Sequence, residues 1–139
     1  MRYPSLSKIQ YVAHELAKEL MEWGEPIPDF DTRYPQKLEG CLGSIKQTFA
    51  KKELYPTLNK KVAALFYFMI KDHPFQNGNK RVAVMSMIYF LYINKKDFKM
   101  DSQNLYNFAK WVAESDPILK EQTMNSIEVI LKKYTKNVK

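Results

Sequence analysis

The chain has 139 residues and a mass of 16.4 kDa, with 45% hydrophobic and 14% aromatic residues, which suits one domain with a real core and excludes a disordered chain. Its four glycines and seven prolines exclude collagen-like repeats, and its single cysteine, Cys41, excludes a disulfide scaffold or a cysteine-based zinc site. The net charge is +7, and the basic residues are spread along the chain. No run contains the roughly five or six like charges of a nucleic-acid-binding arm, so a solvated basic surface is the better explanation.

The first predicted helix covers residues 6–23. Ser5 is a suitable N-cap, and Gly24 is expected to end the helix. Apolar residues recur at steps of three and four on one face, namely Leu6, Ile9, Ala13, Leu16, Leu20 and Trp23. The next stretch, 24–42, is rich in glycine and proline and is predicted to be a long loop. A short helix over 43–50 is expected to follow.

Two strongly apolar helices are predicted in the middle of the chain. Residues 51–56 are predicted to be extended or turn-like, and Thr57 can cap a helix over 58–71. Within that helix the stretch 64–70 is apolar on every side, as in a buried core helix. After a polar break, a second helix over 80–93 is apolar on nearly every face.

The C-terminal part predicts two amphipathic helices. Residues 94–99 form a turn with a short extended piece, and a helix over 103–114 follows with Asp101 or Ser102 as its cap. A helix over 117–134 begins with an Asp-Pro pair, and residues 135–139 are expected to fray.

The whole pattern is that of an all-α protein with two central apolar helices. We expect a single domain over 1–139, with a core over about 40–134 and an N-terminal helix and loop over 1–39. No apolar run approaches the ~20 residues of a membrane span, and no export signal is visible, so a cytoplasmic location is expected.

The break between the two apolar helices concentrates polar groups at residues 72–81, Asp-His-Pro-Phe-Gln-Asn-Gly-Asn-Lys-Arg. It ends at a helix N-terminus, where free N–H groups and the helix dipole attract anions. Gly78 lets the backbone approach a phosphate, and Lys80 and Arg81 add positive charge.

His73 and Asn79 complete this set. Asn79 can cap the helix or donate to a phosphate, and His73 can reach a proton near the bound anion. A base beside a phosphate site suggests phosphoryl or nucleotidyl transfer. On spacing alone, the alternative is a capped helix start with a structural histidine and a solvated Lys-Arg pair.

The stretch 73–81, H-P-F-Q-N-G-N-K-R, resembles the signature of the Fic/Doc (filamentation/death-on-curing) family, H-[P/x]-F-x-[D/E]-[G/A]-N-[G/K]-R, at eight of nine positions. The resemblance covers about 40–134 and, with Lys80 in its slot, is closer to Doc-like toxins. It implies a Fic/Doc-type helical domain with a small β-hairpin flap that aligns the target backbone. Residues 51–57 are the candidate flap.

The resemblance also implies a role for each matching residue. His73 would be the general base that takes a proton from a target hydroxyl, and Phe75 would anchor the loop in the core. The nucleotide phosphates would bind to Gly78, Asn79, Lys80 and Arg81. The family moves a phosphoryl or nucleotidyl group from ATP, or a related nucleotide, to Ser, Thr or Tyr of a protein and uses Mg²⁺. The implied biological role is the toxin of a toxin–antitoxin pair.

Two positions depart from the adenylyltransferase pattern. Asn77 stands where the family usually has an Asp or Glu that holds Mg²⁺, and an amide oxygen is a ligand without charge. A second hypothesis is therefore a catalytically weakened Fic fold that binds nucleotide or a partner. Val84 stands where many Fic adenylyltransferases have a second arginine, which slightly favours phosphoryl transfer.

Other features give weaker expectations. The self-inhibitory pattern [S/T]-x-x-x-E-[G/N] does not occur, so restraint of a toxin should come from a separate antitoxin. Cys41 is expected to be a small buried residue, Asp72 a solvated loop acid and His14 a surface residue. A nucleic-acid-binding domain is the least favoured hypothesis because it rests on charge alone, and no membrane partner is expected.

Overall fold

A computed structural model of the chain describes residues 1–13, 15–16, 35–74 and 78–138. Its secondary structure is mostly helical, with small two-stranded antiparallel sheets, as expected for an all-α Fic-type domain. None of the helices within these ranges combines the length and apolar character needed to cross a membrane.

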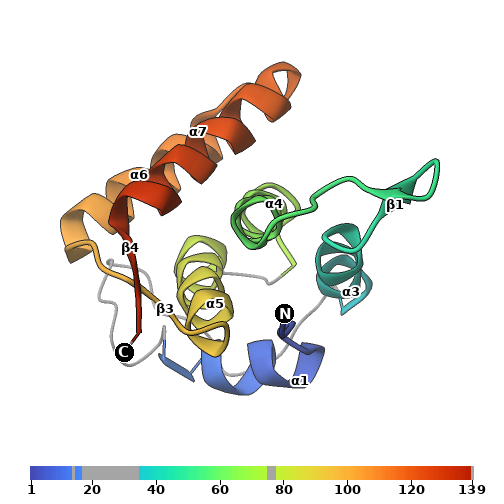
Figure 1. Cartoon of the computed structure of the whole chain (residues 1–139). Helices are drawn as coiled ribbons and strands as arrows, with labels where there is room; N and C mark the ends of the chain where they lie inside the picture. Colours follow the sequence, from blue (N-terminus) through green and yellow to red (C-terminus); the bar gives the residue numbers. More distant parts are fainter. Residues whose placement is uncertain (14, 17–34, 75–77, 139) are drawn as a thin grey trace.

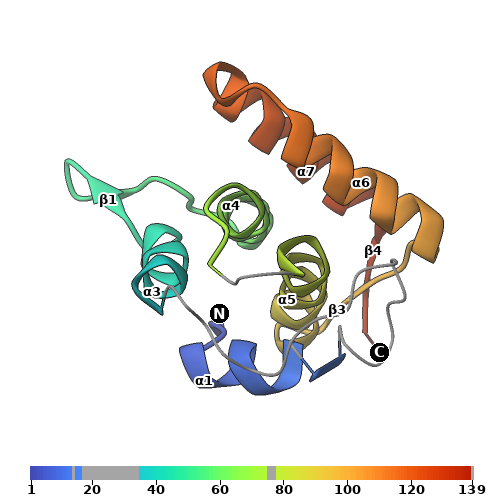
Figure 2. The same cartoon turned by 180° about the vertical axis from the view of Figure 1, so that it is seen from behind.

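Two neighbouring helices, α4 (Leu58–Lys71) and α5 (Asn79–Ile93), lie at the centre of the fold (Figures 1 and 2). α4 begins after Thr57, whose hydroxyl accepts a hydrogen bond from the Lys60 N–H at 3.2 Å. Most residues of both helices are buried, which confirms the prediction of two apolar core helices. α5 begins one residue earlier than predicted.

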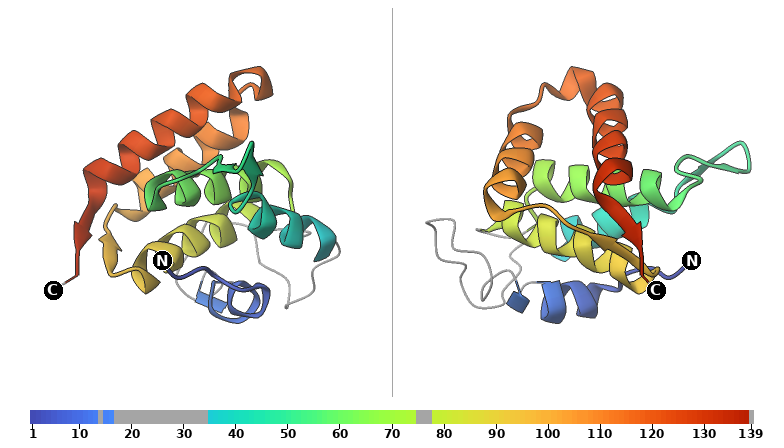
Figure 3. Two further views of the ribbon diagram at one scale, coloured as in Figure 1. Left: turned by 45° about the vertical axis from the view of Figure 1, so that its right-hand side comes forward. Right: turned by 60° about the vertical axis from the view of Figure 1, so that its left-hand side comes forward.

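The other helices cover this central pair on two sides (Figures 1 and 3). On one side lie α6 (Ser102–Glu114) and α7 (Lys120–Tyr134), joined through the 3₁₀ turn η2 (Pro117–Leu119). On the other side lie α1 (Leu6–Lys8) and the π-helical turn η1 (Ile9–Ala13), which packs on α5. The two predicted C-terminal helices are therefore confirmed, with the second one preceded by a 3₁₀ turn.

The N-terminal helix is described only in its first part. Ser5 is its N-cap as predicted, since the Ser5 hydroxyl accepts from the Lys8 N–H at 3.2 Å. Ile9 is completely buried against the core, which agrees with the predicted apolar face. His14, the segment 17–34 and the predicted end at Gly24 lie outside the described residues.

A helix occupies much of the region that the sequence predicts as a loop. α3 spans Pro35–Ser44, so the loop prediction over 24–42 is wrong from residue 35 onward, and the predicted helix over 43–50 is wrong beyond residue 44. Proline is well tolerated at the first position of a helix because its missing N–H has no acceptor there. One face of this segment is buried and packs against α4 through Leu38, Cys41 and Ile45.

The two glycines of α3 explain why this helix was missed. Glycine weakens a helix, so Gly40 and Gly43 favour the prediction of a loop in this region. Both lie inside the helix, and a Cβ built on either would meet no atom within 4 Å. They therefore sit on an open face where no close packing requires them.

A β-hairpin follows α3 and projects from the helical body (Figure 1). Its strands are β1 (Thr48–Phe49) and β2 (Lys52–Glu53), paired Thr48 to Glu53 and Phe49 to Lys52. The candidate flap, 51–57, overlaps only the turn and second strand of this hairpin, which begins three residues earlier, and its role as a flap stays a prediction. The two residues between the strands, Ala50 and Lys51, have φ values of 51° and 66°.

A second antiparallel pair joins β3 (Lys96–Phe98) to β4 (Thr135–Asn137). The extended piece predicted within 94–99 is confirmed. The frayed tail predicted over 135–139 is wrong, because β4 forms a ladder with β3 and the Val138 N–H donates to the Lys95 carbonyl at 2.9 Å. Three residues are too few to show the alternation of apolar and polar side chains that predicts a strand.

Candidate functional site

The first part of the candidate site is the end of α4. The helix stops at Lys71, and the Asp72 N–H donates to the Phe68 carbonyl at 2.8 Å. His73 follows with a φ of 48°, and its side chain is exposed. A left-handed backbone is strained for a residue other than glycine, and Pro74 also disfavours the right-handed helical region for the residue before it. The chain therefore turns sharply at His73, as often happens at functional sites.

The second part is the beginning of α5. Its N-cap residue is Gly78, in the left-handed region with a φ of 76°, and the Val82 N–H donates to the Gly78 carbonyl at 2.9 Å. Other helices begin at residues that cap them with side-chain oxygens, as Thr57 and Asp101 do. Glycine has no such side chain, so the N-cap residue leaves the first N–H groups of α5 open to an anion.

One side-chain contact joins the two parts. Asn79 Nδ2 lies 3.3 Å from His73 Nδ1, and Asn79 is only 9% exposed. Asn79 therefore does not cap the helix from the N-cap position, which was one of its predicted roles, but contacts the histidine across the break. This contact sets the position of the imidazole relative to the helix N-terminus.

The next two residues of α5 have different surroundings. Arg81 is buried, with 6% exposure, whereas Lys80 is exposed. Arg81 belongs to the first turn of α5, so its positive charge adds to the positive end of the helix dipole. The ammonium of Lys80 remains accessible to a ligand from solvent.

The structure brings His73, Gly78, Asn79, Lys80 and Arg81 into one region, between the end of α4 and the first turn of α5. Phe75 and Asn77, predicted as loop anchor and metal ligand, lie outside the described residues. The role of each of these residues stays a prediction. Within the described ranges, no cluster of three or more His, Cys, Asp or Glu side chains could hold a metal ion by itself.

Asp72 contacts a residue that the sequence did not connect with it. One Asp72 carboxylate oxygen lies 3.8 Å from Cys41 Sγ on α3. Cys41 is completely buried, as predicted, and burial together with the negative charge of Asp72 raises the pKa of its thiol to about 12. Asp72 is exposed as expected, but it also links the start of the break to α3.

Sequence reasoning missed the buried Lys61. This residue is 1% exposed, and its ammonium donates to the Ile45 carbonyl at 3.2 Å, to Glu53 Oε1 at 3.0 Å and to the Tyr55 carbonyl at 2.5 Å. It therefore ties the end of α3, strand β2 and the segment after the hairpin to α4. The sequence does contain an indication of this burial, because Lys61 lies four residues before Leu65 and therefore on the same, apolar face of the helix.

Comparison with known families supports the resemblance found in the sequence. Residues 3–91 match the family model described as the Fic/DOC family, which is more than half of the chain. The matched region includes α3, the hairpin, α4, the break and most of α5. No curated protein matches the chain.

Proposed function

Because the chain belongs to the Fic/DOC family, which supports a Fic-type transferase in general, we propose that it transfers a phosphoryl or nucleotidyl group from ATP, or a related nucleotide, to a protein hydroxyl. The acceptor is a Ser, Thr or Tyr side chain. The observation that carries the proposal is the contact between His73 and Asn79 at the N-terminus of α5. This contact supports the proposal because a histidine can act as a base and a helix N-terminus attracts anions.

His73 acts as the general base in this proposal. If His73 Nδ1 accepted a hydrogen bond from the Asn79 amide, the neutral ring would carry its own proton on Nε2, and Nε2 could not act as a base. A half-turn of the amide presents Oδ1 to Nδ1 at the same place. Nδ1–H then donates to Asn79, and Nε2 is left free to take the proton of the acceptor hydroxyl.

Each of the two possible transfer reactions forms one bond to phosphorus and breaks another. The acceptor oxygen forms a bond to phosphorus as its proton moves to His73 Nε2. In phosphoryl transfer the bond to the ADP oxygen breaks, and in nucleotidyl transfer the bond to pyrophosphate breaks. The N–H groups that follow Gly78, together with Asn79, Lys80 and Arg81, hold the phosphate oxygens and stabilise their charge.

Mg²⁺ is expected with the nucleotide. Such an ion usually has one or two protein ligands, with phosphate oxygens and water completing its shell. The Asn77 amide oxygen is a ligand of the right type but without charge, so it fits the ion more weakly than a carboxylate. When bound, Mg²⁺ neutralises phosphate charge.

We favour Doc-like phosphoryl transfer over nucleotidyl transfer because Val84 supplies no second guanidinium and Lys80 matches the Doc-like pattern. On this proposal the chain is the toxin of a toxin–antitoxin pair, restrained by a separate antitoxin. The hairpin β1–β2 is the flap that aligns the acceptor backbone.

The test uses the full chain with Mg²⁺, ATP and a bacterial lysate, followed by mass spectrometry of the labelled proteins. A phosphoryl increment supports the Doc-like reaction, and an AMP increment overturns that preference but retains the transferase. His73→Ala should abolish either increment, because general bases contribute roughly 10²–10⁴-fold. Asn79→Ala should reduce the rate less, by about tenfold. Transfer that survives His73→Ala would refute the base assignment.

The second candidate, a nucleotide- or partner-binding module without turnover, rests on Asn77. Asn77→Asp restores the usual carboxylate, so an increment that appears only in this variant would support the weakened-enzyme hypothesis. ATP binding measured by calorimetry, with no increment in either protein, would support a binding module. Absence of both ATP binding and transfer would exclude the ATP-dependent transferase and an ATP-binding module, and would leave partner binding alone.

A further inference from the structure

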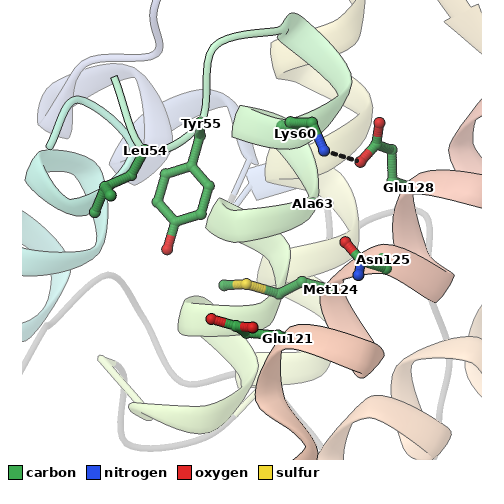
Figure 4. Close-up of a pocket in the computed structure, with 8 residues that line it drawn as sticks. All are labelled: Leu54, Tyr55, Lys60, Ala63, Glu121, Met124, Asn125 and Glu128. Carbon is green, nitrogen blue, oxygen red and sulfur yellow. Dashed lines mark hydrogen bonds and ion pairs between the residues drawn. The ribbon is translucent and has the colours of Figure 1, made fainter. Parts of the chain in front are cut away.

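A small cavity lies beside the base of the hairpin, between α4 and α7 (Figure 4). Its volume is about 180 Å³, and its lining comes from three segments: Leu54 and Tyr55, then Lys60 and Ala63, then Glu121, Met124, Asn125 and Glu128. Sites for small molecules are usually of roughly 300–1,000 Å³. The cavity is thus too small for a nucleotide but large enough for one side chain.

The cavity wall is held in place by the buried Lys61. Its ammonium donates to the Tyr55 carbonyl at 2.5 Å and to Glu53 at 3.0 Å, which fixes the segment that carries Leu54 and Tyr55 against α4. A lining that is positioned before a ligand arrives loses less entropy on binding. The cavity is therefore a preformed feature of the helical body.

Three polar side chains line the cavity without a hydrogen bond or ion pair to the described residues: Tyr55, Glu121 and Asn125. The Tyr55 hydroxyl and the Glu121 carboxylate face the same space (Figure 4). Burial and the charge of Glu121 raise the pKa of Tyr55, so its hydroxyl stays protonated at neutral pH. By contrast, Glu128 is already paired with Lys60, at 3.1 Å.

The local charge is opposite to that of the whole chain. Glu121, Glu128 and Lys60 give the lining a net charge of −1 in a protein of net charge +7. Apolar groups line the rest, chiefly Leu54, Ala63 and Met124. An apolar wall that ends in an unpaired carboxylate suits the long aliphatic stem and charged head of lysine or arginine.

We propose that this cavity binds a lysine or arginine side chain of the polypeptide that lies along the hairpin. The stem packs on Leu54 and Met124, and the cationic head pairs with Glu121. Ala63 and Lys71 are eight residues apart on α4, about 12 Å at the helical rise. The basic residue therefore lies about four extended residues or more from the acceptor hydroxyl. The polypeptide along the hairpin and its identification as the acceptor rest on the proposed function, whereas the preference for a basic side chain rests on the lining of the cavity.

The site can be tested without any enzymatic activity. We would titrate the full chain, at low salt, with Nα-acetyl-lysine-N-methylamide and follow backbone amide resonances by NMR. Saturable shifts should appear at Leu54, Tyr55 and the first turns of α7. The isosteric norleucine derivative should bind more weakly. Glu121→Gln should weaken binding of the lysine compound by about fivefold, the effect of losing one accessible ion pair.

The matched control is Glu114→Gln, which removes an exposed helical glutamate on α6, outside the cavity, and should leave the titration unchanged. Equal shifts with norleucine, or an unchanged affinity in Glu121→Gln, would overturn the proposal. A peptide that contains lysine should bind more tightly than n-butylamine because it also contacts the hairpin, and equal affinity would refute the polypeptide ligand. Binding retained in His73→Ala, with no group transfer by the wild type, would contradict the proposed function alone.

Discussion

The ammonium of Lys61 lies 3.0 Å from the carboxylate of Glu53, and this pair connects the core helix α4 to the second strand of the hairpin. Glu53 is half exposed, whereas Lys61 has almost no contact with solvent. The two backbone carbonyls of Ile45 and Tyr55 complete the ammonium's hydrogen bonds. A buried lysine with all its donors used is a stable arrangement, but removing the ammonium leaves acceptors unpaired.

Lys61→Met should therefore destabilise the protein by about 2–4 kcal/mol, because the substitution keeps the apolar stem and removes three charge-assisted hydrogen bonds. The neighbouring Lys60→Met is the matched control. Lys60 forms a partly exposed pair with Glu128, so its loss should change stability by less than about 1 kcal/mol. Urea unfolding of both variants measures the difference. Equal losses of unfolding free energy in the two variants would show that the buried ammonium of Lys61 stabilises the protein no more than the partly exposed pair of Lys60 does.

The backbone of the hairpin turn is strained at both of its residues, and other residue types would fit this turn better. Ala50 and Lys51 both have positive φ, as in a type I′ turn, where Asn-Gly is preferred. The double variant Ala50→Asn with Lys51→Gly should stabilise the hairpin by about 1 kcal/mol. Hydrogen exchange of the amides of residues 48–54 should slow, while exchange in α4 should not change. Faster exchange in the hairpin would contradict the turn type.

Two glycines should respond to alanine in opposite ways. Gly78→Ala places a side chain on a left-handed residue and should cost about 1–2 kcal/mol of stability. If the proposed function holds, it should also lower the affinity for ATP. Gly40→Ala lies in α3 with open space around it and should stabilise the protein by up to about 1 kcal/mol. Thermal unfolding and ATP binding of both variants test this. A stabilising Gly78→Ala would contradict the left-handed N-cap.

Cys41 should be unreactive in the folded protein. With its pKa raised from 9.0 to about 12, the thiolate fraction near neutral pH is roughly a thousandfold lower than in the unfolded chain. Modification by a disulfide reagent should accelerate in urea, and Asp72→Asn should accelerate it in the native state because a repelling charge is removed. Rapid native labelling would refute this environment.

The same pKa shift has a consequence for stability. The folded state favours the protonated thiol, so the contribution of Cys41 is fully present below the unfolded pKa of 9.0 and is lost as pH rises toward 12. Cys41→Ala should therefore show a shallower decline of unfolding free energy over this range. An identical slope in the variant would contradict the assignment.

The sequence predicted the central helices well because their apolar composition outweighs any local ambiguity. The break between them was recognisable from its residue types, and the structure places His73 next to Asn79 as the proposed chemistry requires. α3 could not be predicted with the same success, since Gly40 and Gly43 are poor helix formers that lie on an open face. Its stability comes from tertiary packing, which propensity does not report.

Two further features depend on long-range contacts. Lys60 and Lys61 are adjacent and chemically identical, and only the packing of α3 and the hairpin makes one buried and the other accessible. β4 likewise forms a strand only by pairing with β3, whose partner residues are 37 or more positions away in the sequence. Local patterns cannot report such pairings.

Both ends of the described chain meet at one turn, Asn94–Lys95. The Asn94 side chain bonds the Arg2 N–H and carbonyl, each at 2.8 Å, and the Lys95 carbonyl accepts from Val138. A force applied to the two ends therefore loads this turn before it reaches the helical core. In a stretching experiment, the strand β4 should separate from β3 in an early, low-force step, and the helical bundle with the proposed nucleotide site should unfold later as one unit.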